Sequence, residues 1–274
     1  MEYKKYTEII DKILNAFEIP EKFGRYYGDE KIDFDFDDFS DKITKVINKI
    51  TPINICYGVS KMVIVPKKYP FVIKIPFNGH FSIDASSVPN FYARESRIPT
   101  NKIIDFYEDA TEKRENWIET HLEDIIYFES FEGACEDNPS DYCLDELQKY
   151  QIVTEKNFSS FFAGTYYYTV KNGRNIYIQE KAIAYCDRST SQIKISKGTL
   201  EKAKKMQDDL YSDFPREWLA TAIECYGENF VTKFLNYVSK DEDELYLWED
   251  MHSGNLGYRL NGTPCIIDFS GWRD

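Results

Sequence analysis

The change of hydrophobic period along the chain constrains its fold most strongly. Runs rich in β-branched and aromatic residues, typical of strands, occupy residues 54–77 and 161–182. Apolar residues at helical spacing occur at 3–17, 39–50, 142–156, 199–211 and 215–239. The order passes from a mainly antiparallel sheet with one packed helix to a mainly helical half. We therefore expect an α+β fold with two lobes.

Local signals refine the boundaries of these elements. Pro66 and Pro70 favour a turn, so residues 54–77 are expected to form a hairpin. Asn172-Gly173 is typical of a two-residue turn between two strands. Ser140-Asp141 is placed to cap the helix that begins at Tyr142.

Two segments are more ambiguous. Residues 33–39 alternate acidic with aromatic side chains, which suits a short exposed strand or a loop, and we favour the loop. Within residues 78–140, acidic side chains far outnumber basic ones, and apolar residues from Ile118 to Phe128 recur near helical spacing. This pattern predicts a helix with a solvated acidic face. A docking surface for a basic partner is the alternative.

The composition narrows the classes of function. The formal net charge is -13, a poor match to nucleic-acid phosphates. The six cysteines are scattered without a C-x-x-C pair, so we expect reduced core thiols rather than a zinc site or disulfides. A long apolar run is missing at the N-terminus and later in the chain, so we expect no membrane partner and a cytoplasmic location.

The most informative motif lies near the C-terminus. Trp248 to Asn255 reads W-E-D-M-H-S-G-N, and Ile266 to Gly271 reads I-I-D-F-S-G. Phosphoryl transfer needs a carboxylate near the acceptor proton, and amide and carboxylate oxygens that hold magnesium. Asp250 would be the catalytic base, and Asn255 and Asp268 the metal ligands.

This pattern resembles the catalytic core of the protein-kinase-like superfamily, nearest to small bacterial, phage and aminoglycoside phosphotransferase-like kinases. Phe71-Val72-Ile73-Lys74 resembles the strand that carries the phosphate-binding lysine, and Tyr57 to Lys61 resembles the glycine-containing loop before it. The resemblance covers roughly 54–75 and 141–274. It implies an antiparallel-sheet N-lobe, a reduced helical C-lobe, and ATP and magnesium as cofactors.

In this interpretation residues 1–53 are an N-terminal helical extension, and residues 54–182 are the N-lobe with an acidic insertion at 78–140. Residues 183–274 are a minimal C-lobe, without the activation segment and later helices of larger relatives. Acceptor recognition would then depend on the extension, the insertion or a second protein.

Lys74 lies among apolar residues and needs an anionic partner. Glu146 is the preferred partner, because it shares a helix face with Cys143 and Leu147, whereas Asp145 is expected beside Lys149 on the solvent side. Glu95 and Glu155 are the alternatives. We therefore expect Lys74 and Glu146 to act with Asp250 in catalysis.

The nucleotide is expected to contact two further segments. Gly58 would let the loop backbone approach the phosphates, and Ser60 and nearby amides would replace the family's missing glycines. The resemblance implies that the connector Gln179-Glu180-Lys181-Ala182 binds adenine through its backbone. Two departures stand out: Trp248 occupies a position commonly held by histidine, and Ser270 replaces the glycine of D-F-G. His252 is expected to hold its loop by hydrogen bonding.

The primary hypothesis is an ATP- and magnesium-dependent kinase that transfers the γ-phosphoryl group to a hydroxyl, with a protein acceptor favoured over a small molecule. A pseudokinase binding module is the first alternative. Nucleotidyl transfer from the same site is the second.

Overall fold

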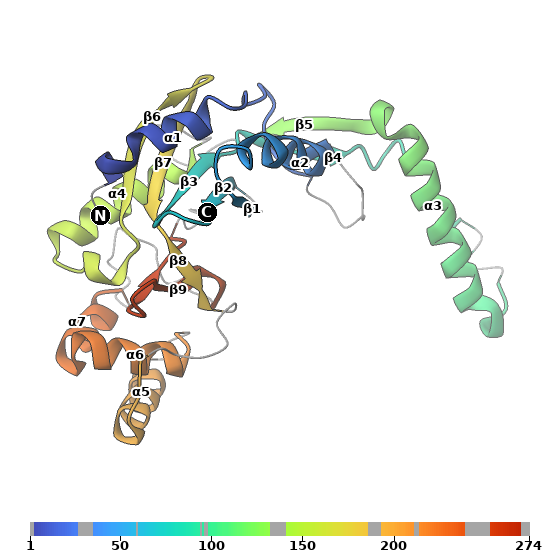
Figure 1. Ribbon diagram of the computed structural model, residues 1–274. Coiled ribbons are helices and arrows are strands. Elements are labelled where there is room, and N and C mark those ends of the chain that lie inside the picture. The colour runs from blue at the N-terminus through green and yellow to red at the C-terminus, as the bar shows by residue number, and fades with distance from the viewer. Residues whose placement is uncertain are drawn as a thin grey trace.

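The computed structural model describes residues 3–26, 35–58, 60–93, 95, 98–131, 141–185, 193–210, 214–238 and 253–269. Its fold is α+β, and its described strands pair antiparallel (Figure 1). The helices are α1 (Thr7–Leu14), α2 (Asp35–Ile47), α3 (Ile103–Ile125), α4 (Tyr142–Glu155), α5 (Lys197–Leu210), α6 (Arg216–Tyr226) and α7 (Glu228–Val238). The strands are β1 (Ile53–Tyr57), β2 (Lys61–Pro66), β3 (Phe71–Pro76), β4 (Gly79–Ile83), β5 (Ile126–Ser130), β6 (Thr165–Lys171), β7 (Arg174–Glu180), β8 (Ala182–Ala184), β9 (Leu256–Arg259) and β10 (Pro264–Ile266).

A five-stranded sheet in the order β1-β2-β3-β7-β6 forms the first part of the molecule. Because side chains alternate along a strand, β3 sends Phe71, Ile73 and Ile75 to one face, and Val72 and Lys74 to the other. The first face packs against α1 and α2. The core on this face comprises Ile10, Ile13, Leu14, Ile43, Ile47, Met62, Ile64, Phe71, Ile73, Ile75, Ile176 and Ile178, among others.

The structure corrects two expectations in this part. Residues 54–77 form three strands rather than one hairpin, because β1 and β2 pair as well as β2 and β3. Residues 35–39 belong to α2 rather than to a loop, while 33 and 34 lie outside the described residues. Asp38 pairs with Lys42 one turn later at 3.4 Å, the spacing at which opposite charges support a helix.

Two expected features in this part are confirmed. Asn172 and Gly173 both have positive φ angles, 49° and 75°, as a type I′ turn between β6 and β7 requires. Asp141 caps α4 by accepting a hydrogen bond from the backbone N–H of Leu144 at 3.0 Å. The same carboxylate accepts from the Tyr177 hydroxyl at 2.6 Å and from the Asn175 amide at 2.7 Å. These bonds attach the start of α4 to β7.

The second part combines α5, α6 and α7 with the small sheet β10-β9-β8. Its core includes Trp218, Phe234, Leu256 and Ile266. One helix was expected over 215–239, but the structure has α6 and α7, separated by Gly227 at a φ of 85°. That conformation suits glycine and cannot continue an α-helix.

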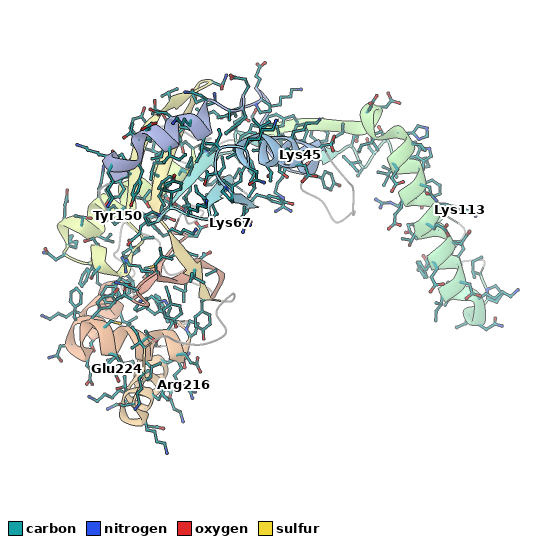
Figure 2. The ribbon with its side chains drawn as sticks, in the orientation of Figure 1. Lys45, Lys67, Lys113, Tyr150, Arg216 and Glu224 are labelled. Atoms are coloured by element: carbon teal, nitrogen blue, oxygen red, sulfur yellow. The ribbon has the colours of Figure 1, made fainter. Side chains whose placement is uncertain are left out.

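A projecting arm lies between β3 and α4 in the sequence. Its base is the ribbon of β4 and β5, and its far end is the long helix α3, which lies away from both cores in Figure 1. The predicted acidic helix is thus present, although Ile126 and Phe128 belong to β5 instead. Figure 2 shows Lys113 on this distant helix.

Among the described residues, no helix combines the length and apolarity needed to cross a membrane. The cysteines differ in environment: Cys143 and Cys265 are buried, as expected of core thiols, but Cys56 is exposed. Cys56 lies on the edge strand β1, on the same face as Asn54. Cys135 and Cys186 lie outside the described residues.

Candidate functional site

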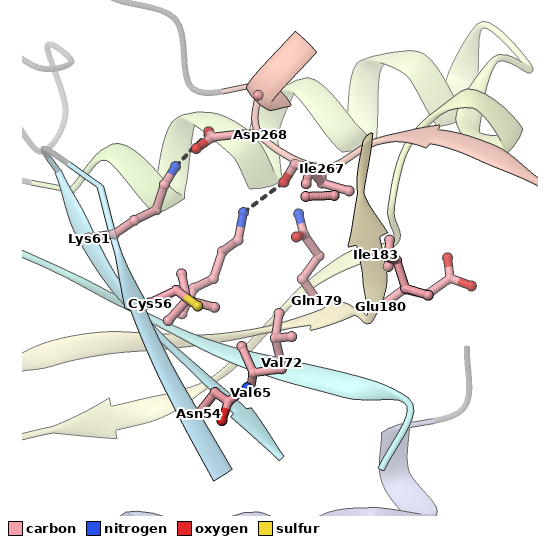
Figure 3. Close-up of a pocket in the computed structure, with 15 residues that line it drawn as sticks. Asn54, Cys56, Lys61, Val65, Val72, Gln179, Glu180, Ile183, Ile267 and Asp268 are labelled. Carbon is pink, nitrogen blue, oxygen red and sulfur yellow. Dashed lines mark hydrogen bonds and ion pairs between the residues drawn. The ribbon is translucent and has the colours of Figure 1, made fainter. Parts of the chain in front are cut away.

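A cavity of about 390 Å³ opens on the sheet face that α1 and α2 leave uncovered (Figure 3). Strand alternation selects its lining, because Lys61, Val63 and Val65 of β2 share a face with Val72 and Lys74 of β3. The rest of the lining comprises Asn54, Cys56, Gln179, Glu180, Ala182, Ile183, Ala184, Gly254, Ile267 and Asp268. The lining is thus mainly apolar, with Lys61, Lys74 and Asp268 grouped together at one end, and a mainly apolar lining with a few polar groups is common in ligand sites.

Lys74 and Glu146 form the expected ion pair. The Lys74 ammonium lies 2.7 Å from Glu146 Oε2 and 3.0 Å from Oε1, and it also donates to the Ile267 carbonyl at 3.0 Å. Both side chains are buried, Glu146 completely. The pair joins β3 to α4, which packs on the same sheet. At about 4 Å and an effective dielectric constant near 20, such a pair attracts by roughly 4 kcal/mol before desolvation.

Lys61 is a second lysine in this cluster, although it was expected in a loop and without a role. Its ammonium lies 2.5 Å from Glu146 Oε1 and 2.8 Å from Asp268 Oδ1. Val63 pairs with Lys74 across β2 and β3, so Lys61 is a diagonal neighbour of Lys74 on one face. The sequence signal for the position of Lys61 was its alternation with Val63 and Val65. That signal places Lys61 beside Lys74 only when the register of β2 against β3 is known.

Burial and neighbouring charges shift the pKa values of Glu146, Asp268 and Lys61. Burial raises the pKa of Glu146, although both lysines oppose the rise. Burial would also raise the pKa of Asp268, but Lys61 and Lys74 outweigh it and hold that pKa below its usual range. Burial would lower the pKa of Lys61, yet the carboxylates of Asp268 and Glu146 raise it. Asp268 and Lys61 therefore stay charged at neutral pH.

Asn255 and Asp268 are adjacent through the backbone. The Asn255 carbonyl accepts from the N–H groups of Ile267 at 2.8 Å and Asp268 at 3.3 Å. The two expected metal-binding segments thus lie side by side, with Asn255 buried and the side chain of Asp268 35% exposed. The proposed base Asp250 lies outside the described residues, as do Trp248, His252 and Ser270.

Only some residues of the expected adenine connector lie at the cavity. Gln179, Glu180 and Ala182 line the cavity, whereas Lys181 does not. The Lys181 ammonium donates to the Pro66 carbonyl at 2.7 Å, and its N–H donates to the Pro70 carbonyl at 3.0 Å. The connector is therefore tied to the turn after β2 at Lys181.

Gly58 and Ser60 lie in the sequence between Cys56 and Lys61, which line the cavity. Neither Gly58 nor Ser60 is among the described residues that line it. A Cβ added to Gly58 would meet no atom within 4 Å, and its φ is not left-handed. Neither the conformation nor the surroundings of Gly58 require glycine here. Ser60 is buried, and its carbonyl accepts from the Phe77 N–H at 2.9 Å.

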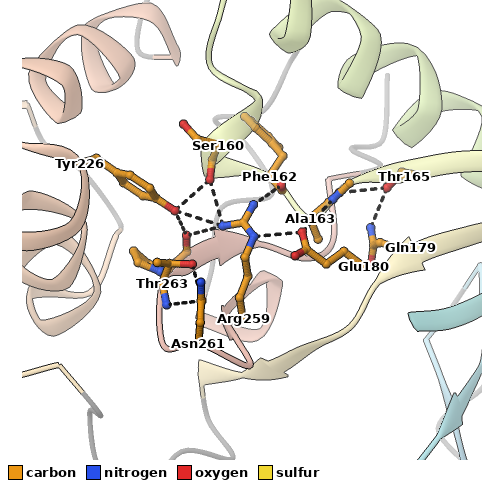
Figure 4. A network of polar contacts seen from close by, with 12 residues as sticks. Ser160, Phe162, Ala163, Thr165, Gln179, Glu180, Tyr226, Arg259, Asn261 and Thr263 are labelled. Carbon is orange, nitrogen blue, oxygen red and sulfur yellow. Dashed lines mark hydrogen bonds and ion pairs between the residues drawn. The ribbon is translucent and has the colours of Figure 1, made fainter. Parts of the chain in front are cut away.

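Arg259 contacts Glu180 of the connector (Figure 4). Its guanidinium lies 2.9 Å from Glu180 Oε2 and donates to the carbonyls of Ser160 at 3.0 Å and Phe162 at 2.7 Å. It also donates to the Pro264 carbonyl at 3.2 Å and the Tyr226 hydroxyl at 3.0 Å. The planar fork of arginine suits such a multiple contact. Arg259 thus fixes Glu180 to both β10 and α6.

One expectation on α4 is wrong. Asp145 and Lys149 do not face solvent: their side chains are 7% and 1% exposed, with Oδ2 and Nζ 2.8 Å apart. The two atoms form an ion pair without hydrogen-bond geometry. The helix is more covered than its sequence indicates because it contacts both β3 and β6. Mutual neutralisation allows both charges to be buried.

The described residues include no group of three or more His, Cys, Asp or Glu side chains able to hold a metal ion. The Asp268 carboxylate in the cavity fits magnesium, which proteins usually bind through one or two carboxylates together with substrate phosphates.

No protein-family model matches the chain, and no curated protein matches it significantly.

Proposed function

We propose that the protein is an ATP- and magnesium-dependent phosphotransferase with a two-lobed, protein-kinase-like fold. The observation that carries the proposal is the contact network of Lys74, Glu146 and Asp268 at the charged end of the cavity. In protein kinases a lysine on the third strand pairs with a glutamate on a helix, and a nearby aspartate holds magnesium.

The arrangement of elements supports this proposal. Apart from the arm, the order along the chain is three strands of one antiparallel sheet, the helix α4, and then two further strands of the same sheet. The last of these strands, β7, ends at Glu180, within the connector 179–182. Val65, Val72 and Ile183 would enclose the adenine ring, while Lys74 would contact the phosphates. Magnesium held by Asp268 and Asn255 would offset the charge that develops on the transferred group.

Asp250 completes the proposal as the residue that orients the acceptor hydroxyl, on sequence grounds alone. A protein acceptor remains the favoured class. The protein would position the nucleotide and stabilise charge, because phosphoryl transfer requires little covalent chemistry from the enzyme.

Labelled ATP tests the reaction directly. Purified protein incubated with magnesium and γ-labelled ATP should autophosphorylate or release labelled phosphate. Asp268→Asn and Lys74→Met should each lower that rate by about 100-fold or more, as loss of a charge-stabilising group typically does. Asp105→Asn, which changes an exposed carboxylate on α3 in the arm, is the matched control and should retain activity. Equal rates in all four proteins would refute the proposal, and transfer of label from α-labelled ATP would indicate nucleotidyl transfer.

A nucleotide-binding module without turnover is the second candidate. The contact of Lys61 with Asp268 favours it, since an ammonium there occupies one oxygen of the proposed metal ligand. A thermal-shift titration separates the two candidates. Stabilisation by magnesium and ATP, with no turnover of labelled ATP, supports the module.

A further inference from the structure

Lys61 holds an unusual position for a residue on β2. Its side chain is 4% exposed, and its ammonium bridges Glu146 of α4 and Asp268 near the C-terminus. Lys74 already supplies Glu146 with two hydrogen bonds. Lys61 is therefore not needed to give Glu146 a cationic partner. What it adds is a direct contact with Asp268, which Lys74 does not make, because Lys74 donates to the carbonyl of Ile267 instead.

The contact with Asp268 competes with a metal on the same oxygen. Magnesium binds carboxylate oxygens at about 2.1 Å in octahedral geometry. An ammonium 2.8 Å from Asp268 Oδ1 takes up one lone pair of that oxygen and repels a nearby cation. Binding of a divalent cation through Oδ1 is therefore weakened until Lys61 moves away.

The cavity offers Lys61 another partner. Lys61 lines it beside Lys74 and Asp268, so triphosphate oxygens that reach Lys74 would also be within reach of Lys61 (Figure 3). Lys61 is a diagonal neighbour of Lys74 on the same sheet face, so both side chains extend from one rigid element while their ammonium groups can change partner. A triphosphate brings enough negative charge to replace the carboxylate as the partner of Lys61.

We propose that Lys61 takes the place of the divalent cation at Asp268 in the ligand-free protein, and leaves it when triphosphate oxygens bind its ammonium. Lys61 is thus a positioning residue that makes metal binding at Asp268 depend on the nucleotide. This inference rests on the proposed function, because Asp268 must be a metal ligand. It goes beyond the resemblance, which assigns no role to Lys61.

Manganese binding without nucleotide tests the inference by a readout other than activity. Free Mn²⁺ is measured by electron paramagnetic resonance as it is titrated with the full-length chain. Lys61→Met should bind Mn²⁺ at least about tenfold more tightly than the unaltered protein, because a nearby positive charge is removed. Lys68→Met is the matched control: it removes the same charge from an exposed position between β2 and β3. It should change the affinity by less than about twofold, as expected of a screened surface charge.

Two further variants complete the test. Lys61→Gln removes the charge but keeps a hydrogen-bonding group, and it should reproduce the gain if Lys61→Met fails to fold. Adding Asp268→Asn to either variant should abolish the gain. Inorganic triphosphate should raise the Mn²⁺ affinity of the unaltered protein more than that of Lys61→Gln.

The outcomes separate this inference from the proposed function. If a folded Lys61 variant gains no affinity for Mn²⁺, the inference is overturned, whatever the protein's activity. If Asp268→Asn leaves the binding of magnesium and ATP unchanged, the proposed function fails as well, because Asp268 is then no metal ligand. If the gain survives Asp268→Asn, the Mn²⁺ site lies elsewhere and the inference is again overturned.

Discussion

Glu146 is the residue on which the charge balance of the cavity depends. Its carboxylate is fully buried and accepts hydrogen bonds from Lys61 and Lys74 together. With Asp268, the cluster contains two ammonium groups and two carboxylates, so its formal charge is zero. Buried charges are tolerated in such neutral, hydrogen-bonded groups and are costly when one member is removed.

Glu146→Gln should therefore destabilise the protein strongly. The substitution preserves volume but leaves two buried ammonium groups against one carboxylate, and the free energy of unfolding should fall by about 3–5 kcal/mol. Urea unfolding followed by circular dichroism measures the loss. Glu155→Gln is the matched control on the same helix, and because Glu155 is exposed it should change stability by less than about 0.5 kcal/mol. A loss below about 1 kcal/mol for Glu146→Gln would show that the cluster is not balanced as described.

The sequence predicted part of this cluster for identifiable reasons. The contact of Lys74 with Glu146 followed from the apolar surroundings of Lys74 and from the helix face that Glu146 shares with Cys143. Lys61 was not predicted, because its place beside Lys74 depends on the register of β2 against β3. Asp145 was misplaced because amphipathicity alone does not reveal that a second strand, β6, covers α4.

At the scale of elements, α4 brings Glu146 to the cavity, and Asp141 fixes the start of that helix. One carboxylate caps α4 and accepts hydrogen bonds from Tyr177 and Asn175 on β7. The helix is therefore attached to the sheet at its first turn, before Glu146. Capping was foreseen from Ser140-Asp141, but the bonds to β7 were not, since they join residues far apart in the chain.

Asp141→Ala should loosen this attachment. It removes the cap and leaves the buried Tyr177 hydroxyl without its acceptor, so stability should fall by about 2–4 kcal/mol. Tyr177→Phe removes only one of the three hydrogen bonds and should cost about 1 kcal/mol. Thermal and urea unfolding of both variants measure the difference. Equal losses in the two variants would contradict the description of Asp141 as the centre of this attachment.

The break between α6 and α7 was not predicted from the sequence. The apolar period runs through 215–239, and only the φ of Gly227 divides it. A single glycine inside a helical pattern is tolerated often enough that its presence does not predict a break. The boundary at Pro215, by contrast, was foreseen and marks the N-cap of α6.

At the scale of the whole molecule, the arm is separate from the two cores. Among the described residues of 84–125, the buried apolar side chains Ala110, Ile118 and Ile125 all lie on α3. None of these described residues belongs to the core around α1 or to that around α6. Ile83 of β4 pairs with Ile126 of β5, so the two strands at the base of the arm already lie side by side where the segment that carries α3 departs from them.

Replacing residues 85–124 with a short Asn-Gly turn should therefore leave the remaining protein folded. The melting temperature should change by less than about 4 °C, equivalent to about 1 kcal/mol or less for a chain of this size. Ile13→Ala, which opens a cavity in the core under α1, should cost about 2–5 kcal/mol and is the comparison. Differential scanning calorimetry measures both. Unfolding of the truncated chain at a much lower temperature would mean that the arm supports a core.

The sequence predicted the α+β class and the acidic helix, because period and charge are local properties. It did not predict that this helix is connected to the rest of the protein through the ribbon of β4 and β5, away from the cores. The two strands pair across more than forty residues, and such a distant pairing leaves no local pattern in the sequence. The charged cluster of the cavity also depends on distant contacts, since Lys61 and Asp268 are about two hundred positions apart.

The central claim is that Lys74 and Asp268 serve one nucleotide site that requires magnesium. Isothermal titration with a nonhydrolysable ATP analogue, with and without magnesium, tests it most directly. We predict one site per chain, with affinity that falls at least about tenfold when magnesium is omitted or Asp268 is changed to Asn. Absence of binding, or binding that is indifferent to magnesium, Asp268→Asn and Lys74→Met, would contradict the account.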